Sequence, residues 1–191
     1  MKAAMLRMLA LMWAWSPLLS DLTTTPRGVL PLGFFLPLIA RTKMKKFING
    51  NKVIRHSNAV AAGSTDITPS GAIDTKGFRR ATFIAEFGAI VSGAVTGVRV
   101  QQSDDNAVAD DYTDLTGTAL AVADDDDNGV AIVEILEPQK RYLKMIVDRA
   151  TQNATLEGIT VILSEPDSEP VTQDATVLGS EFHQSPAEGT A

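Results

Sequence analysis

The residues best able to do chemistry in this chain are clusters of aspartate, and the densest is the run Asp124–Gly129. Oxygens from Asp124, Asp126 and Asn128 could converge on a cation such as Ca²⁺. Counted from Asp124, however, the twelfth position is Ile135, so the bidentate glutamate of a calcium-binding loop is missing. Asp, Asn and Gly also favour tight turns for backbone reasons. A solvated turn is therefore the preferred interpretation, and a cation site is the alternative.

Two further acidic pairs, Asp104-Asp105 and Asp110-Asp111, contain the groups used in general acid–base catalysis. No aromatic-lined cleft is predicted around them, since both tryptophans, Trp13 and Trp15, lie near the N-terminus. The sequence has no G-x-S-x-G motif and no phosphate-binding or dinucleotide-binding glycine pattern. It also has no cysteine, which excludes disulfides, thiolate zinc sites and cysteine nucleophiles. We therefore expect no enzymatic activity and no cofactor.

Two histidines and two basic pairs remain as candidate functional residues. His56 and His183 are far apart in the sequence, and a lone histidine is more often a surface or interface residue than a base or ligand. The pairs Arg79-Arg80 and Lys140-Arg141 are explained by ordinary strand-edge charge, which discourages edge pairing. The alternative is that they dock onto an acidic neighbour. Together with Phe182 and His183 in the tail, they are the candidate contacts with a partner protein.

The charge of the chain restricts the partners further. The 191 residues carry a net charge of −6, and from Met44 onward 12 basic and 22 acidic residues leave −10. Affinity for nucleic acid depends on clustered Lys and Arg, so we expect no nucleic-acid binding. The length is sufficient for one domain with extensions.

Residues 1–43 differ in composition from the rest of the chain. Two apolar runs, Ala3–Leu19 and Gly28–Ala40, are interrupted by Arg7 and by prolines. The segment fits a signal peptide poorly, because no clean cleavage site follows the first apolar run. It also fits a transmembrane span poorly, because a span needs roughly 20 apolar residues and neither run reaches that length without a proline or a charge. A structural arm is a further interpretation. The favoured one is an over-extended reading frame with the natural start at Met44, and membrane association is not expected.

From Met44 the sequence has a β pattern with turns every 8–14 residues or so. We predict an all-β fold of about eight strands, an antiparallel β-sandwich or jelly roll, over residues 44–165. The candidate strands are Lys52–Ser57, Ile67–Asp74, Phe78–Phe87, Ala94–Gln102, Tyr112–Leu115, Thr118–Ala123, Val130–Leu136, Arg141–Asp148 and Gly158–Leu163.

Three of these strands carry more specific predictions. Thr118–Ala123 and Val130–Leu136 should form a hairpin, because the intervening Asn128-Gly129 pair supplies the positive φ of a tight turn. Val130–Leu136 is apolar on both faces, which predicts a central, covered strand. In Phe78–Phe87 alternate residues should face the core, namely Ala81, Phe83, Ala85 and Phe87.

The C-terminal segment, residues 166–191, is small and polar. The prolines of Glu165–Pro170 cannot continue a strand, since proline lacks the backbone donor. One interpretation is a disordered tail. The other is an arm that becomes ordered when it lies on a neighbouring subunit.

Several stretches after Met44 resemble a head-decoration, or cement, protein of tailed bacteriophages. The resemblance covers about three quarters of the chain and excludes residues 1–43. It includes no enzymatic motif, so no catalytic residue is carried over. The stretches are Val98–Asp105 followed by Tyr112–Gly117, Lys140–Lys144 leading into Val147-Asp148-Arg149, and the tail from Pro170-Val171-Thr172 through Ser185–Ala191.

The resemblance implies structural work on the surface of a virion. Proteins of this kind bind the major capsid protein, often as dimers or trimers, and hold the assembled head together. It also implies synthesis in the cytoplasm of the bacterial host. Alternative interpretations are a tail- or fibre-associated β-sandwich module, a carbohydrate-binding module, and an exported or membrane-tethered β domain.

Overall fold

The computed structural model describes residues 46–190, and the predicted leader, residues 1–43, lies outside this range. The described residues form ten strands and one short helix. These elements are α1 (Phe47–Gly50), β1 (Asn51–Ser57), β2 (Val60–Gly63), β3 (Ile73–Asp74), β4 (Phe78–Ile90), β5 (Val95–Ser103), β6 (Thr113–Asp114), β7 (Leu120–Val122), β8 (Val130–Leu136), β9 (Tyr142–Ala150) and β10 (Ala154–Pro166).

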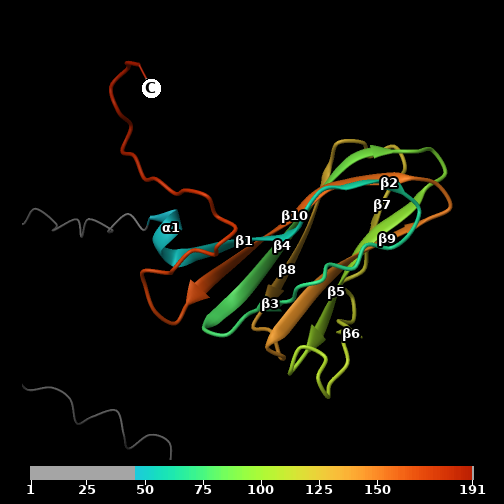
Figure 1. Ribbon diagram of the computed structural model, residues 1–191, viewed down its shortest axis with the longest axis horizontal. Coiled ribbons are helices and arrows are strands. Elements are labelled where there is room, and N and C mark those ends of the chain that lie inside the picture. Colours follow the sequence, from blue (N-terminus) through green and yellow to red (C-terminus); the bar gives the residue numbers. More distant parts are fainter. Residues whose placement is uncertain (1–45, 191) are drawn as a thin grey trace, which may run out of the picture. The chain divides into compact units, whose positions relative to one another are not determined.

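The strands form two antiparallel sheets that pack face to face (Figure 1). Sheet A has the order β1-β10-β4-β8, with β2 also paired to β10. Sheet B has the order β3-β9-β5-β6, with β7 also paired to β5. The predicted all-β antiparallel sandwich is confirmed.

The core lies between the two sheets and follows the alternation of the central strands. Phe83 of β4 and Met145 of β9 are fully buried from opposite sheets. The predicted inward face of β4 is confirmed, since Ala81, Phe83, Ala85 and Phe87 are at most 3% exposed. Strands β5, β9 and β10 also alternate toward the core. The inward residues of these three strands include Val98, Val100, Leu143, Met145, Val147, Ile159, Val161 and Leu163, each at most 1% exposed.

The prediction for Val130–Leu136 is wrong in two respects. Among the described residues this strand, β8, pairs only with β4 and lies at the edge of sheet A, so it is not a central strand there. It also forms no hairpin with β7, because β7 pairs with β5 in sheet B. The turn at Asp124–Gly129 therefore crosses from one sheet to the other, although Asn128 does adopt the expected positive φ of 57°.

Two smaller predictions also need correction. Only the end of Ile67–Asp74 is a strand, β3, while Ile67 makes an isolated bridge to Val147 of β9. Strand β2 was not predicted. Its four residues pair with β10 across a register shift, and so short a strand has little alternation to detect.

Candidate interaction surfaces

The acidic turn between β7 and β8 uses its carboxylates to hold backbone. Asp127 Oδ1 accepts a hydrogen bond from Ile90 N at 2.6 Å, and Asp126 Oδ2 accepts one from Ala123 N at 3.2 Å. Asp124 Oδ2 accepts from Gly93 N. These bonds tie the crossover to the β4–β5 turn. Among residues 46–190 no group of three His, Asp or Glu side chains is placed to hold a metal ion. The cation site at Asp124, Asp126 and Asn128 stays an alternative prediction.

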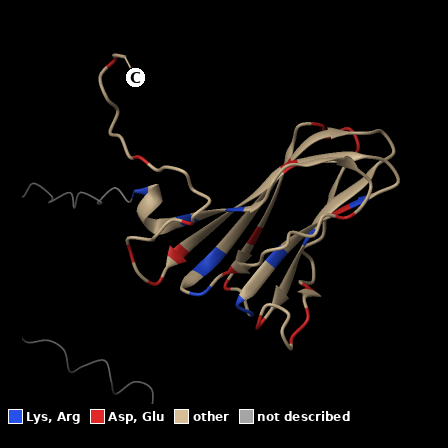
Figure 2. Cartoon of the chain, viewed as in Figure 1, with Lys and Arg blue, Asp and Glu red and all other residues tan. Residues whose placement is uncertain are grey.

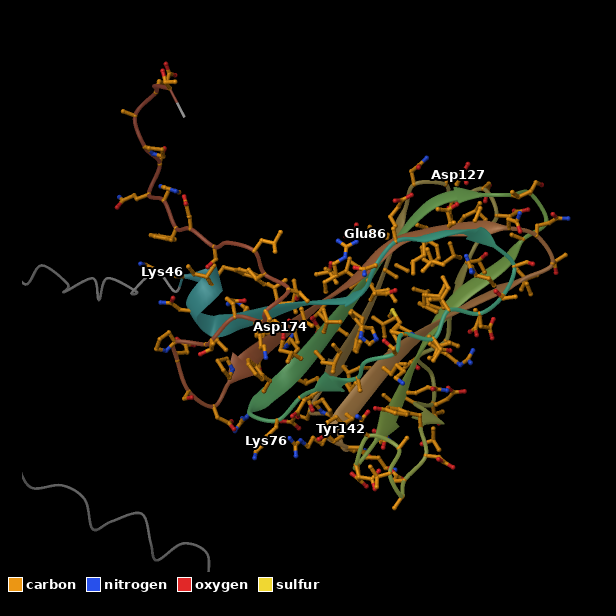
Figure 3. The ribbon with its side chains drawn as sticks, viewed as in Figure 1. Lys46, Lys76, Glu86, Asp127, Tyr142 and Asp174 are labelled. Carbon is orange, nitrogen blue, oxygen red and sulfur yellow. The ribbon has the colours of Figure 1, made fainter. Side chains whose placement is uncertain are left out.

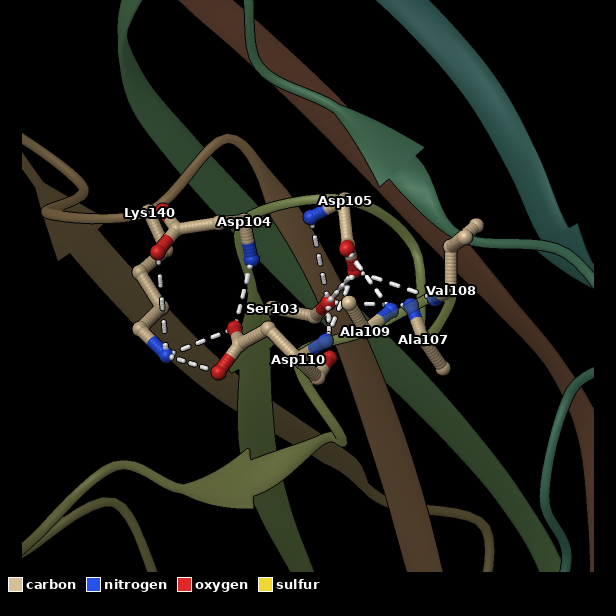
Figure 4. Close-up of polar contacts among 8 residues, drawn as sticks. All are labelled: Ser103, Asp104, Asp105, Ala107, Val108, Ala109, Asp110 and Lys140. Carbon is tan, nitrogen blue, oxygen red and sulfur yellow. Dashed lines mark hydrogen bonds and ion pairs between the residues drawn. The ribbon is translucent and has the colours of Figure 1, made fainter.

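The second acidic loop, between β5 and β6, is closed on itself (Figure 4). Asp105 accepts hydrogen bonds from three backbone N–H groups, those of Val108, Ala109 and Asp110. Burial opposes ionisation of Asp105, but these bonds lower its pKa overall. Asp110 accepts two contacts from Lys140 Nζ at 2.8 and 2.6 Å, which lower its pKa. Both groups are thus held as carboxylates that support the loop.

Three of the four predicted basic contacts are occupied within the chain. Arg80 bridges Glu134 and Glu165 on the outer face of sheet A, with both distances 2.8 Å. Lys140 pairs with Asp110, as described, and Arg141 pairs with Asp74 at 2.6 Å. An acidic partner would have to displace these internal pairs.

The fourth, Arg79, is exposed at the beginning of β4. Within the described residues, Arg79 and the nearby Lys76 have no ion-pair partner. Figure 2 shows basic positions on β4 and β9 and acidic positions mainly in the loops. Because Arg80, Lys140 and Arg141 are paired with acids of the same chain, Arg79 is the member best placed to meet an external group.

His56 is half-buried and contacts strands of both sheets. It lies at a register shift of β1, and its Nε2 accepts a hydrogen bond from Met145 N of β9 at 3.3 Å. Its ring also packs edge-on against Phe83, with the centroids 5.9 Å apart. Burial lowers the pKa of His56 to about 4, assisted by the nearby charge of Lys144. A neutral imidazole thus fills the gap in β9 pairing between Ile67 and β3.

Arg149 is a buried residue that sequence reasoning missed. It is 5% exposed, and its guanidinium donates to the carbonyl oxygens of Ala61, Thr65 and Ala154 at 2.8–3.0 Å. Burial lowers its pKa. The side chain fastens β2 and the segment after it to the sandwich, which is a structural role.

The beginning of the C-terminal tail lies along the free edge of β1. Gln173 carries this contact: its Oε1 accepts from Val53 N at 3.0 Å, and its Nε2 donates to the carbonyls of Ile48 and Asn51 at 2.9 and 2.6 Å. Further contacts are Val171 N to Asn49 O, Arg55 N to Thr176 Oγ1, and the ion pair of Lys52 with Asp174. The edge of β1 is thus covered by the chain itself.

Beyond this anchor the tail is open to solvent. Residues 178–190 are all exposed, with Leu178 fully so and Phe182 at 46%. The ring of Phe182 lies 4.5 Å from Lys46 Nζ, and His183 contacts Glu181 at 2.7 Å. Figure 3 shows Asp174, in the anchor, beside β1. The two predicted tail contacts, Phe182 and His183, therefore lie on an arm whose base is fixed.

The opposite edge of sheet A carries an exposed apolar strip on β8. Val130, Ile132 and Leu136 are 63%, 55% and 57% exposed on the outer face. The fourth outward residue, Glu134, is paired with Arg80. We call these four residues the β8 strip. It combines a free strand edge with apolar side chains, which is an arrangement typical of a binding surface.

A groove lies beside the β8 strip, at the seam between β7 and β8. It has a volume of about 410 Å³. Its lining combines the apolar side chains of Phe87, Leu120 and Val122 with the acidic turn at Asp125–Asp127. Val130 belongs to both features, so the groove and the β8 strip form one continuous surface.

Comparison with known proteins assigns this chain to no family. No protein-family model and no curated protein matches the chain. A chain in the structure of infectious bursal disease virus Gx strain is 14% identical, at a TM-score of 0.35, over 62% of this chain and 32% of its own length. A chain of dimeric latent PorU from Porphyromonas gingivalis is 8% identical, at a TM-score of 0.34, over 63% of this chain and 13% of its own. Matches at this level assign no function.

Between residues 46 and 190 no helix has the length and apolar character needed to cross a bilayer.

Proposed function

We propose that this chain is a structural virion protein that decorates the assembled head of a tailed bacteriophage and binds its major capsid protein. In this role it is made in the host cytoplasm, acts at the capsid surface, and needs neither a cofactor nor catalysis. The resemblance of residues 98–117, 140–149 and 170–191 to head-decoration proteins motivates the proposal.

The observation that carries the proposal is the anchored arm. Gln173 and Thr176 hold the tail to β1, so residues 178–190 project from a defined point on the sandwich. Anchoring lowers the entropy that the arm loses on binding, since its base is already ordered. Leu178 and Phe182 then present apolar side chains to a neighbour. Many copies on a repeated lattice reinforce one another through multivalency.

The polar residues of the sandwich favour this role over an enzymatic one. The carboxylates of the acidic loops accept hydrogen bonds from backbone N–H groups and from Lys140. No observation favours the carbohydrate-binding alternative. The two tyrosine rings are covered by cations, with Lys144 Nζ 4.4 Å from the ring of Tyr112 and the guanidinium of Arg141 4.9 Å from that of Tyr142.

Co-sedimentation of the full chain with purified heads tests the proposal. The wild-type protein should sediment with heads and saturate at a fixed ratio to the capsid protein. The double variant L178A/F182A should bind at least about tenfold more weakly, because each buried apolar side chain contributes about 1.5–3 kcal/mol. The control is V108A, which truncates an 85% exposed valine on the β5–β6 loop.

Failure of the wild-type protein to sediment with heads at saturation would reject the function. Sedimentation that L178A/F182A leaves unchanged would retain the function and reject the arm as its binding element.

A further inference from the structure

The hydrogen-bonding phase of β8 shows which of its backbone groups are free. Phe87 N donates to Gly129 O, and Glu137 N donates to Arg79 O, with β8 and β4 in continuous register between these pairs. Odd-numbered residues of β8 therefore bond to β4, and even-numbered ones direct N–H and C=O away from the sheet. Within residues 46–190, the residues of β8 with free backbone groups are therefore those of the β8 strip.

This edge has none of the features that usually prevent strand addition. Val130–Leu136 contains no lysine, no proline and no bulge, and its register with β4 is unbroken. Its single charge, Glu134, is neutralised by Arg80 at 2.8 Å. A seven-residue strand with a free ladder and an apolar face is thus presented to solvent.

We propose that the β8 strip binds a second copy of this chain, by antiparallel pairing of β8 with β8 across a two-fold axis at Val133. In this register Val130 faces Leu136 of the second copy, and Ala131 faces Ile135. Ile132 faces the Arg80-paired Glu134. All seven residues are used, and no two like charges oppose each other. Two sheets A join into one, and the seam groove lies beside the joint.

The charge distribution favours a second copy in this orientation. Each chain carries the acidic turn Asp124–Asp127 directly before β8. Antiparallel pairing places the two acidic turns at opposite ends of the paired strands, roughly 20 Å apart for seven residues. This exceeds the Debye length of about 8 Å at physiological salt, so their repulsion is screened. Shifting the axis to Glu134 would instead oppose two glutamates.

The mass of the full chain in solution, with a matched pair of charge variants, tests the pairing. The wild-type protein should have twice the 20.4 kDa chain mass by light scattering. I132E places a glutamate opposite Glu134 of the second copy and should give monomers. I132K places a lysine there and should keep the dimer. V108E, on an 85% exposed residue away from β8, should also remain dimeric.

The register is tested separately by cysteine cross-linking, since the chain has no native cysteine. The Cα atoms of a directly opposed, non-hydrogen-bonded pair lie about 4.5 Å apart, within the range of a disulfide. V133C should therefore form a covalent dimer under mild oxidation. I135C, opposite Ala131, should not. The cross-linking result therefore does not depend on whether I132E and I132K fold.

Three results would overturn the inference: a monomeric wild-type protein at its highest soluble concentration, equal dissociation of I132E and I132K, or cross-linking of I135C in place of V133C. Binding of a capsid strand to the β8 strip would appear as a monomer that loses head binding on I132E. The inference does not depend on the proposed function, because mass and cross-linking are measured without heads.

Discussion

The two edges of sheet A differ in whether another segment of the chain covers their backbone groups. At β1, the amides of Val53 and Arg55 donate to Gln173 and Thr176 of the tail, so the edge is covered. At β8, the corresponding groups of Ile132 and Glu134 are directed outward beside an apolar face. An exposed edge is a site of strand addition, and proteins normally protect it. The edge of β1 is thus completed within the chain, and the proposed dimer would complete that of β8.

The manner in which β1 is covered also matters. The tail contributes side chains, not a strand, because its anchor includes Pro170 and no ladder follows Pro166. Gln173 uses both ends of its amide, so one residue satisfies three backbone groups. The contacts with β1 end at Thr176, and residues 178–190 beyond them are exposed as an arm.

The largest expected effect is on the core that both edges share. Phe83 is fully buried between the sheets, so F83A should lower the free energy of unfolding by about 3–5 kcal/mol through lost burial and a cavity. Urea denaturation followed by circular dichroism measures it. A cost below about 1 kcal/mol would mean that the two sheets are not packed as described.

The covered edge also carries the main pH sensitivity above pH 4. The folded pKa of His56, about 4, lies below the ordinary value of 6.5. The unfolded chain therefore binds more protons between these values, and stability is full above pH 6.5 and falls as the pH drops toward 4. Relative to H56Q, the wild-type protein should lose about 3 kcal/mol across this range.

Glutamine at position 56 can still accept the Met145 N–H but does not titrate, so the difference between the two unfolding curves isolates the histidine. Asp74, Asp110 and Asp174 have lowered pKa values and lose stabilisation at more acidic pH in both proteins. Parallel curves between pH 6.5 and 4 would contradict the half-buried, neutral His56.

Removal of the tail anchor should have an intermediate effect. Q173A leaves Val53 N and two carbonyls without their partner, at a cost of about 1–3 kcal/mol. Limited proteolysis should then cut the tail before the sandwich. Q139A, on an exposed glutamine of the β8–β9 loop, is the control. Equal protection of the tail in Q173A and Q139A would refute the anchor.

The smallest effect is expected when the β8 strip is changed and the free energy of unfolding of the single chain is measured. L136S changes a side chain that is 57% exposed, so it should alter the stability of the dilute chain by no more than about 0.5 kcal/mol. Thermal unfolding at low and high protein concentration separates fold from association. A loss at low concentration as large as that of F83A would show that Leu136 belongs to the core.

The sequence predicts the sandwich well where burial is one-sided. Alternation in β4, β9 and β10 reflects one face against the core and one outward, which a period of two reports directly. The prediction fails at β8. A strand that is apolar on both faces fits the centre of a covered sheet, but it fits equally well an edge strand that has an exposed apolar face. Nothing local distinguishes the two.

The contacts that define the surfaces were not predictable in the same way. Gln173 reaches Val53 across 120 positions, and His56 reaches Met145 across 89, so no spacing rule connects them. The run Asp124–Gly129 does contain the predicted turn, since Asp and Asn accept from nearby backbone N–H groups. The basic pairs, in contrast, depend on acids that only the fold brings near, such as Glu134 beside Arg80.

Hydrogen exchange of the full chain, resolved to single amides at two protein concentrations, tests the contrast between the edges most directly. Val53 and Arg55 should be protected at both concentrations. Ile132 and Glu134 should exchange rapidly in dilute solution and become protected at high concentration. Strong protection of Ile132 and Glu134 at high dilution, or rapid exchange of Val53 in the intact chain, would contradict the account.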